Sequence, residues 1–166
     1  MKSKAGLCRT VVFGILTIVC MVLIFMFSSD NADKSSEKSG EVTKAVVEAT
    51  VPDYEEMPAE KQESILDKAE HIVRKCAHFS IFMALGFCAS CTVGRRKIFG
   101  IRTLAVVGFC FLYACSDEIH QTFIPGRAGM FTDVLIDTSG AVIGTIISLV
   151  MLAFFALVTG KKKAAD

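Results

Sequence analysis

Nine ionisable side chains between residues 74 and 137 lie inside or beside apolar stretches, where charge is costly. The acids are Asp117, Glu118, Asp133 and Asp137, the basic residues are Arg74, Lys75 and Arg127, and the histidines are His78 and His120. Carboxylates and imidazoles in a poorly solvated site can transfer protons. Guanidinium groups bind phosphates and carboxylates through paired hydrogen bonds. The set therefore predicts an anion-binding pocket or an acid–base site.

The spacing of the first basic residues is helical. His71, Arg74, Lys75 and His78 recur at intervals of three and four, which places all four on one helix face. At the end of an apolar helix this face would carry positive charge toward neighbouring helices.

The next polar group follows the uncharged stretch 103–116, which is too short to cross a bilayer core of about 30 Å as a helix. The helix is therefore predicted to continue to the turn at Pro125 and Gly126. This extension carries Asp117, Glu118, His120 and Gln121 into the outer leaflet. Of these, 117, 120 and 121 share one face.

The last polar group opens the final apolar stretch. Asp133 and Asp137 lie one helical turn apart, and the same face continues as Gly140, Gly144 and Ser148. Small residues allow helices to approach closely in a membrane. The face that carries the two aspartates is therefore predicted to pack inside a helix bundle.

The elements that must position these groups are apolar helices. Hydrophobic residues make up 52% of the 166 residues, and the mean hydropathy is +0.52. The apolar residues form blocks, which predicts an all-α integral membrane protein, a single domain over 1–166, with a four-helix transmembrane bundle in contact with the lipid bilayer. The predicted spans are about 9–27, 74–94, 103–124 and 133–158.

Charge is distributed unevenly although the net charge is only +1. Basic residues gather at both ends of the chain and at 95–97, whereas the segment 28–70 holds twelve acids and five lysines. By the positive-inside rule both termini are expected in the cytoplasm, with 28–70 as an extracytoplasmic loop. The first apolar stretch is predicted to be an uncleaved anchor, because Phe27 precedes a plausible cleavage position where a small residue is usual.

The extracytoplasmic loop contains few structural signals. The stretch 28–40 is polar and predicts a solvated linker. Residues 41–50 could form a weak helix that has little to pack against, and Pro52 and Pro58 interrupt the chain. From Ala59 onward apolar residues recur at helical spacing, which predicts an amphipathic segment that runs into the second span.

Metal, cofactor and nucleic-acid binding are not predicted. The seven cysteines lie in or beside apolar blocks and are interpreted as small packing residues. His78, Asp117, Glu118 and His120 include zinc-binding types, but their spacing matches no strong zinc motif, and three nearby cations oppose a metal. No phosphate-binding loop and no nucleic-acid motif is present.

Several motifs together resemble the VanZ-like family of membrane proteins. The run from Arg74 to Phe79 resembles its R-K-x-x-H-F motif, and the run from Asp117 to Arg127 resembles D-E-x-x-Q-x-F-x-P-x-R. The run from Asp133 to Gly144 resembles D-x-x-x-[ND]-x-x-G-x-x-x-G, and Phe27-Ser28-Ser29 matches F-S-S. Two positions depart from the family pattern: Asp30 replaces a frequent Gln, and Ile81-Phe82 replace a common Glu-Tyr pair.

The resemblance implies a bacterial plasma-membrane protein linked to the cell envelope. The family is named for a protein associated with low-level resistance to the glycopeptide teicoplanin, so a role in tolerance is expected. It supplies no reaction. The missing Glu after His78-Phe79 weakens any transfer of detailed chemistry to this chain.

The leading hypothesis is that the polar groups bind an anionic envelope or glycopeptide ligand. The expected ligand-binding residues are Arg74, Lys75, His78, Asp117, Glu118, Gln121, Arg127, Asp133 and Asp137. One alternative is a membrane-embedded enzyme that acts on a lipid-linked substrate, with Asp117, Glu118, His78 and His120 as the candidate acid–base residues. A second is a structural or partner-binding ion-pair network. A proton-coupled transporter is least favoured, because the other halves of the spans are apolar.

Overall fold

The computed structural model describes residues 4–29, 32–94, 98–125, 127 and 129–163. Over these residues the chain is all-α, and no strand is formed. The five α-helices are α1 (Lys4–Ser29), α2 (Ala32–Thr50), α3 (Ala59–Val93), α4 (Ile101–Gln121) and α5 (Phe131–Lys163), with a 3-10 turn at Tyr54–Glu56. The basic residues 95–97, on which the predicted orientation partly depends, and the departure at Asp30 lie outside the described residues.

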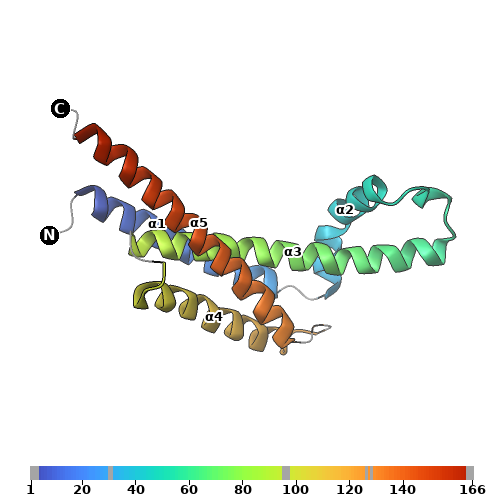
Figure 1. Cartoon of the computed structure of the whole chain (residues 1–166). Helices are drawn as coiled ribbons and strands as arrows, with labels where there is room; N and C mark the ends of the chain where they lie inside the picture. The colour runs from blue at the N-terminus through green and yellow to red at the C-terminus, as the bar shows by residue number, and fades with distance from the viewer. Residues whose placement is uncertain (1–3, 30–31, 95–97, 126, 128, 164–166) are drawn as a thin grey trace.

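Helices α1, α3, α4 and α5 form a bundle in which successive helices run in opposite directions (Figure 1). Both termini therefore lie at the same end of the bundle. At the other end α1 and α4 finish and α5 begins, while α3 extends beyond this end. We refer to this second end as the polar end of the bundle, because it gathers the ionisable residues.

Three of the helices are long and apolar enough to cross a membrane. They include Gly6–Ser29 in α1, Ala59–Val93 in α3 and Phe131–Val158 in α5. Helix α4 is not among them, because Asp117, Glu118 and other polar residues in its last turns lower its hydropathy. The prediction of an all-α membrane protein is thus supported, whereas the fourth span stays a prediction.

The small-residue stripe of α5 packs against α3, as the sequence predicts. A side chain at Gly140 would meet the backbone of Phe79, and one at Gly144 would meet the backbone of Met83 and Phe87. The relation is reciprocal, since a side chain at Gly86 of α3 would meet the backbone of α5. The missing side chains let the two backbones touch, which gives α3 and α5 the most extensive contact of the bundle.

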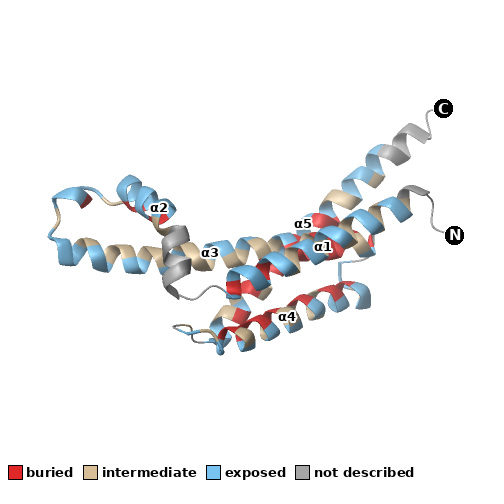
Figure 2. Ribbon diagram, turned by 180° about the vertical axis from the view of Figure 1, so that it is seen from behind, coloured by how far each residue is buried: buried red, intermediate tan, exposed pale blue. Residues whose placement is uncertain are grey.

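The apolar core lies where these helices meet. Phe82 and Leu85 of α3 are fully buried and pack with Ile24 of α1 and Cys110 of α4. The outward faces of the same helices expose large apolar side chains, and Figure 2 shows buried residues concentrated along the inward faces. Such exposed faces suit a lipid environment rather than water.

The segment predicted as a loop is largely helical, and this corrects two expectations. Helix α2 covers most of 28–50, where a linker and a weak helix were expected. It does have a partner: it lies against the first part of α3 and buries Thr43 and Val47. The prediction failed because it took this segment to be solvated and gave it no packing partner on α3. The continuous helix from Ala59 into the apolar part of α3 is confirmed.

Candidate functional site: a charged cavity at the polar end

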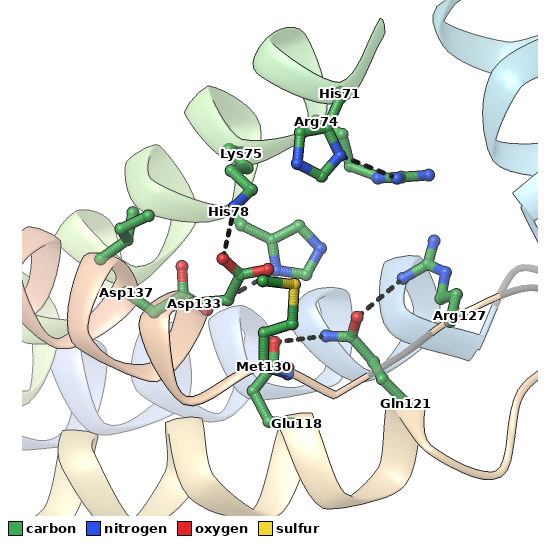
Figure 3. A pocket seen from close by; sticks show the side chains of 11 residues that line it. His71, Arg74, Lys75, His78, Glu118, Gln121, Arg127, Met130, Asp133 and Asp137 are labelled. Carbon is green, nitrogen blue, oxygen red and sulfur yellow. Dashed lines mark hydrogen bonds and ion pairs between the residues drawn. The ribbon is translucent and has the colours of Figure 1, made fainter. Parts of the chain in front are cut away.

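A cavity of about 230 Å³ opens between α3, α4, α5 and the connection that precedes α5 (Figure 3). It is lined by His71, Arg74, Lys75, His78, Glu118, Gln121, Arg127, Met130, Asp133, Ile136 and Asp137. The predicted ligand-binding residues are thus brought to one place, with Asp117 just behind the lining. Most of the wall is polar or ionisable although the surrounding helices are apolar.

Helix α3 supplies the basic wall of the cavity. His71, Arg74, Lys75 and His78 all line it, as their shared helix face predicts. The Lys75 ammonium donates a hydrogen bond of 2.6 Å to Oδ1 of Asp133. An Arg74 guanidinium nitrogen lies 3.5 Å from Nδ1 of His71, on its own helix. The positive charge of Lys75 is therefore neutralised by Asp133 of α5. The polar contact recorded for Arg74 is with a histidine, which leaves its charge without a recorded acidic partner among the described residues.

Helix α4 supplies the acidic floor through its last turns. The Glu118 carboxylate is buried and accepts a hydrogen bond of 2.8 Å from the backbone N–H of Met130. The Gln121 amide donates to Glu118 at 3.1 Å and to Asp117 at 2.9 Å. Gln121 thus holds two adjacent carboxylates in place, and Glu118 fixes the connection that leads into α5.

Asp117 lies deeper than the cavity lining, at the junction of three helices. Its Oδ2 accepts a hydrogen bond of 2.8 Å from the hydroxyl of Ser28, the penultimate residue of α1. The Nδ1 atom of His78 lies 4.0 Å from the same oxygen and 3.8 Å from Oδ2 of Asp137. Asp117 and Asp137 are both almost completely buried, so His78 faces two desolvated carboxylates.

Arg127 links the connection between α4 and α5 to the rest of the polar end. Its guanidinium donates to the backbone carbonyl of Phe27 at 3.1 Å and lies 3.5 Å from the side-chain oxygen of Gln121. Part of this side chain is engaged with α1, and part borders the cavity. Arg127 thus has both a positioning contact and a place in the cavity wall.

His120 does not join the cavity, contrary to the prediction. Its Nε2 lies 3.1 Å from the hydroxyl of Ser29, and its ring stacks on Phe25 with the centroids 4.7 Å apart. Successive residues of a helix are rotated by about 100° around its axis. Glu118 and Gln121 therefore lie to one side of Asp117, and His120 lies to the other side. That other side is covered by α1. The cavity therefore receives Glu118 and Gln121, whereas the prediction grouped residues 117, 120 and 121 on one face.

The structure adds residues that the sequence prediction left out. Ser28 donates a hydrogen bond to Asp117. Its place in the Phe27-Ser28-Ser29 motif could have marked it as a site residue. His71 lines the cavity, and its position on the face of Arg74 and His78 could have included it. Met130 and Ile136 also line the cavity, but nothing in their residue types marks them as site residues.

Metal-ligating atoms also gather here, in a different set from the one considered in the sequence. Ligand atoms of His78, Asp117 and Asp137 all lie within 4.8 Å of one another. Of the four residues considered above for zinc, Glu118 and His120 are outside this group. Asp137, from a different helix, completes it instead.

One comparison with known proteins gives a match. The family model described as VanZ/LLP1 matches residues 13–154, which include every residue of the cavity. The chain matches no curated protein and no solved structure.

Proposed function

Because the chain belongs to the VanZ/LLP1 family, we propose that it is a multi-pass protein of the bacterial plasma membrane that binds an anionic ligand in the charged cavity. In this proposal α4 is the fourth span, both termini are cytoplasmic, and the polar end opens to the outer side. The ligand carries a phosphate or carboxylate and is a lipid-linked envelope molecule or a glycopeptide. Its capture contributes to tolerance of teicoplanin-type antibiotics.

The observation that carries this proposal is the convergence of three basic side chains on one cavity. Arg74 and Lys75 reach it from α3, and Arg127 reaches it from the connection before α5. A guanidinium group can pair with a phosphate or carboxylate through two parallel hydrogen bonds. Lys75 is already paired with Asp133, so Arg74 is the main anion contact on α3. Arg127 faces the cavity from the connection while it also holds Phe27 and Gln121. A position at the edge of apolar helices suits a ligand with both a charged and a lipid part.

The first experiment measures teicoplanin susceptibility in a sensitive Gram-positive host. It compares empty vector, wild type, Arg74→Ala, Arg127→Ala and Lys44→Ala at equal membrane levels. Lys44 is the matched control, because it is exposed on α2 and pairs only with Glu48 of the same helix among its recorded ion pairs. We expect wild type and Lys44→Ala to raise tolerance and the two arginine variants to lose most of the effect. Equal loss in Lys44→Ala, or no effect of the wild type, would contradict the proposal.

An acid–base enzyme is the second candidate, and one observation favours it. Glu118 and His78 both line the cavity, and the Glu118 carboxylate is buried there. A proton donor and acceptor beside a bound anion could act on its ester or amide bonds. Glu118→Gln separates the two candidates, since it keeps the shape of the side chain but abolishes proton transfer. Retained tolerance in this variant favours binding, whereas complete loss with normal folding favours catalysis.

A purely structural network is the third candidate. The pairing of Lys75 with Asp133 and the contacts of Gln121 fit this role as well. If it is correct, substitutions of cavity residues reduce the yield of folded protein in detergent in parallel with tolerance. If Arg74→Ala loses tolerance at wild-type yield, the cavity has a function beyond holding helices together.

A further inference from the structure

Three side chains from three helices bring possible metal-ligand atoms close together beside the cavity. Nδ1 of His78 lies 3.8 Å from Oδ2 of Asp137 and 4.0 Å from Oδ2 of Asp117. Ligands of one tetrahedral metal ion at about 2.1 Å lie about 3.4 Å from each other. The two separations from His78 exceed this value by about half an ångström. The three ligand atoms already lie within 4.8 Å of one another.

The charge balance of this group calls for a cation. Asp117 is 4% exposed and Asp137 is 2% exposed. Among the described residues their recorded ion pairs are with His78 alone. Both separations are longer than a charge-assisted hydrogen bond, which spans about 2.7–2.9 Å. Two desolvated carboxylates without a close cation are costly, and a divalent ion between them and the imidazole removes that cost.

Neighbouring side chains hold Asp117 in place. Ser28 and Gln121 both donate hydrogen bonds to its Oδ2, and such contacts orient a carboxylate ligand. A bound ion replaces one of these two hydrogen bonds or coordinates the other oxygen, Oδ1. The nearest lysine, Lys75, is engaged by Asp133 rather than by the group. The repulsion from three cations that argued against a metal in the sequence is thus weakened, because pairing removes one of them.

We propose that His78, Asp117 and Asp137 bind one divalent transition-metal ion. One imidazole nitrogen with two carboxylates suits Zn²⁺ and Mn²⁺ better than the softer metals that prefer sulfur. His78 and Asp137 also line the cavity, so the ion lies at its wall and has a coordination position open to a ligand. The proposal does not depend on which anion, if any, the cavity takes.

The test is direct metal binding by the full chain in detergent micelles. The protein is purified without a histidine tag, stripped with a chelator and titrated with Zn²⁺ or Mn²⁺, and bound metal is counted by mass spectrometry. We expect close to one ion per chain. His78→Ala, Asp117→Asn and Asp137→Asn are expected to weaken binding about tenfold or more, in line with the loss of metal-site residues. His71→Ala and Glu48→Gln are the matched controls and should bind metal like wild type, because His71 lines the cavity outside the group and Glu48 is an exposed carboxylate on α2.

The outcomes separate the possibilities. Size exclusion and thermal unfolding show whether each variant is folded, and three separate ligand substitutions keep the test valid if one of them is not. Absence of stoichiometric metal on folded wild type would overturn the proposal. Equal weakening in Glu48→Gln would also overturn it, because general surface charge would then explain the binding. Metal binding without any effect on tolerance would leave this proposal intact and contradict only the proposed function.

Discussion

Asp117 connects three helices through a single carboxylate. It sits on α4, accepts hydrogen bonds from Ser28 of α1 and Gln121 of its own helix, and faces His78 of α3. A buried carboxylate needs such donors, because removing one leaves an acceptor that water cannot reach. The polar end of the bundle thus depends on a few short contacts around this residue.

The Ser28 contact gives a prediction at this scale. Ser28→Ala removes a hydrogen bond to a buried carboxylate and should lower the free energy of unfolding by about 1–3 kcal/mol. Ser116→Ala is the matched control, because Ser116 is exposed and bonds only to the backbone of its own helix among its recorded contacts. Thermal unfolding in detergent measures both. A control that destabilises as much as Ser28→Ala would rule out the buried contact as the cause.

Lys75 and Asp133 form the shortest ion pair recorded in the cavity, at 2.6 Å, and each side chain is about one quarter exposed. Partial burial reduces solvent screening, so the pair should contribute more than a fully exposed one. A double-mutant cycle with Lys75→Ala and Asp133→Ala should give a coupling free energy of about 1 kcal/mol.

The cycle is measured by unfolding of the two single variants and the double variant. Strict additivity of the two substitutions would show that the pair contributes nothing beyond its separate side chains. The exposed pair of Lys44 and Glu48, at 3.7 Å, provides a reference cycle for which we expect a smaller coupling.

At the scale of helices, the packing of α3 against α5 determines how the two walls of the cavity face each other. Glycines remove the side chains at three points of this interface, so the backbones touch and the helices cross closely. Asp133 and Asp137 lie on the same face of α5 as Gly140 and Gly144. Close packing at the glycines therefore holds the aspartates against the basic face of α3.

Enlarging one glycine tests this arrangement. Gly144→Ala places a methyl group against the backbone of Met83 and should destabilise the protein by about 1–3 kcal/mol. Gly108→Ala is the control, because a methyl group there meets no atom within 4 Å and alanine favours a helix. Unfolding in detergent should show Gly108→Ala at or above wild-type stability. If Gly144→Ala is as stable to unfolding as Gly108→Ala, the close contact between the helices is contradicted.

Membrane topology is decided at the scale of the whole molecule. Three helices meet the length and hydropathy of a membrane span, yet α4 lies alongside them and its 21 residues are about 31 Å long. If α4 crosses the bilayer, both ends of the chain are on one side. If it does not, they are on opposite sides.

Reporter fusions at the two ends measure this directly. A reporter that works only in the cytoplasm should be active at both termini, and a periplasmic or external reporter at neither. A reporter inserted near Tyr54, between α2 and α3, should show the opposite pattern. Opposite locations of the two termini would exclude the four-span arrangement and place α4 at the membrane surface.

The helical class, the apolar segments and most of the residues around the cavity follow from the sequence alone. Apolar blocks, helical spacing and glycine stripes are local properties, and each depends only on which residues lie within a few turns of one another. The face of Arg74, Lys75 and His78 and the packed face of Asp133 and Asp137 were predictable for this reason.

Which of these groups meet depends on the tertiary structure. His120 turned away because α1 covers its side of α4, and Ser28 entered because α1 ends beside Asp117. The partnership of His78 with Asp117 and Asp137 joins three helices, and no spacing along the chain encodes it. Helix α2 packs for the same reason: α3 extends far enough to receive it. Contacts between distant segments depend on the direction of each helix and on its rotation about its axis. A small error in the predicted rotation therefore gives the wrong contacts.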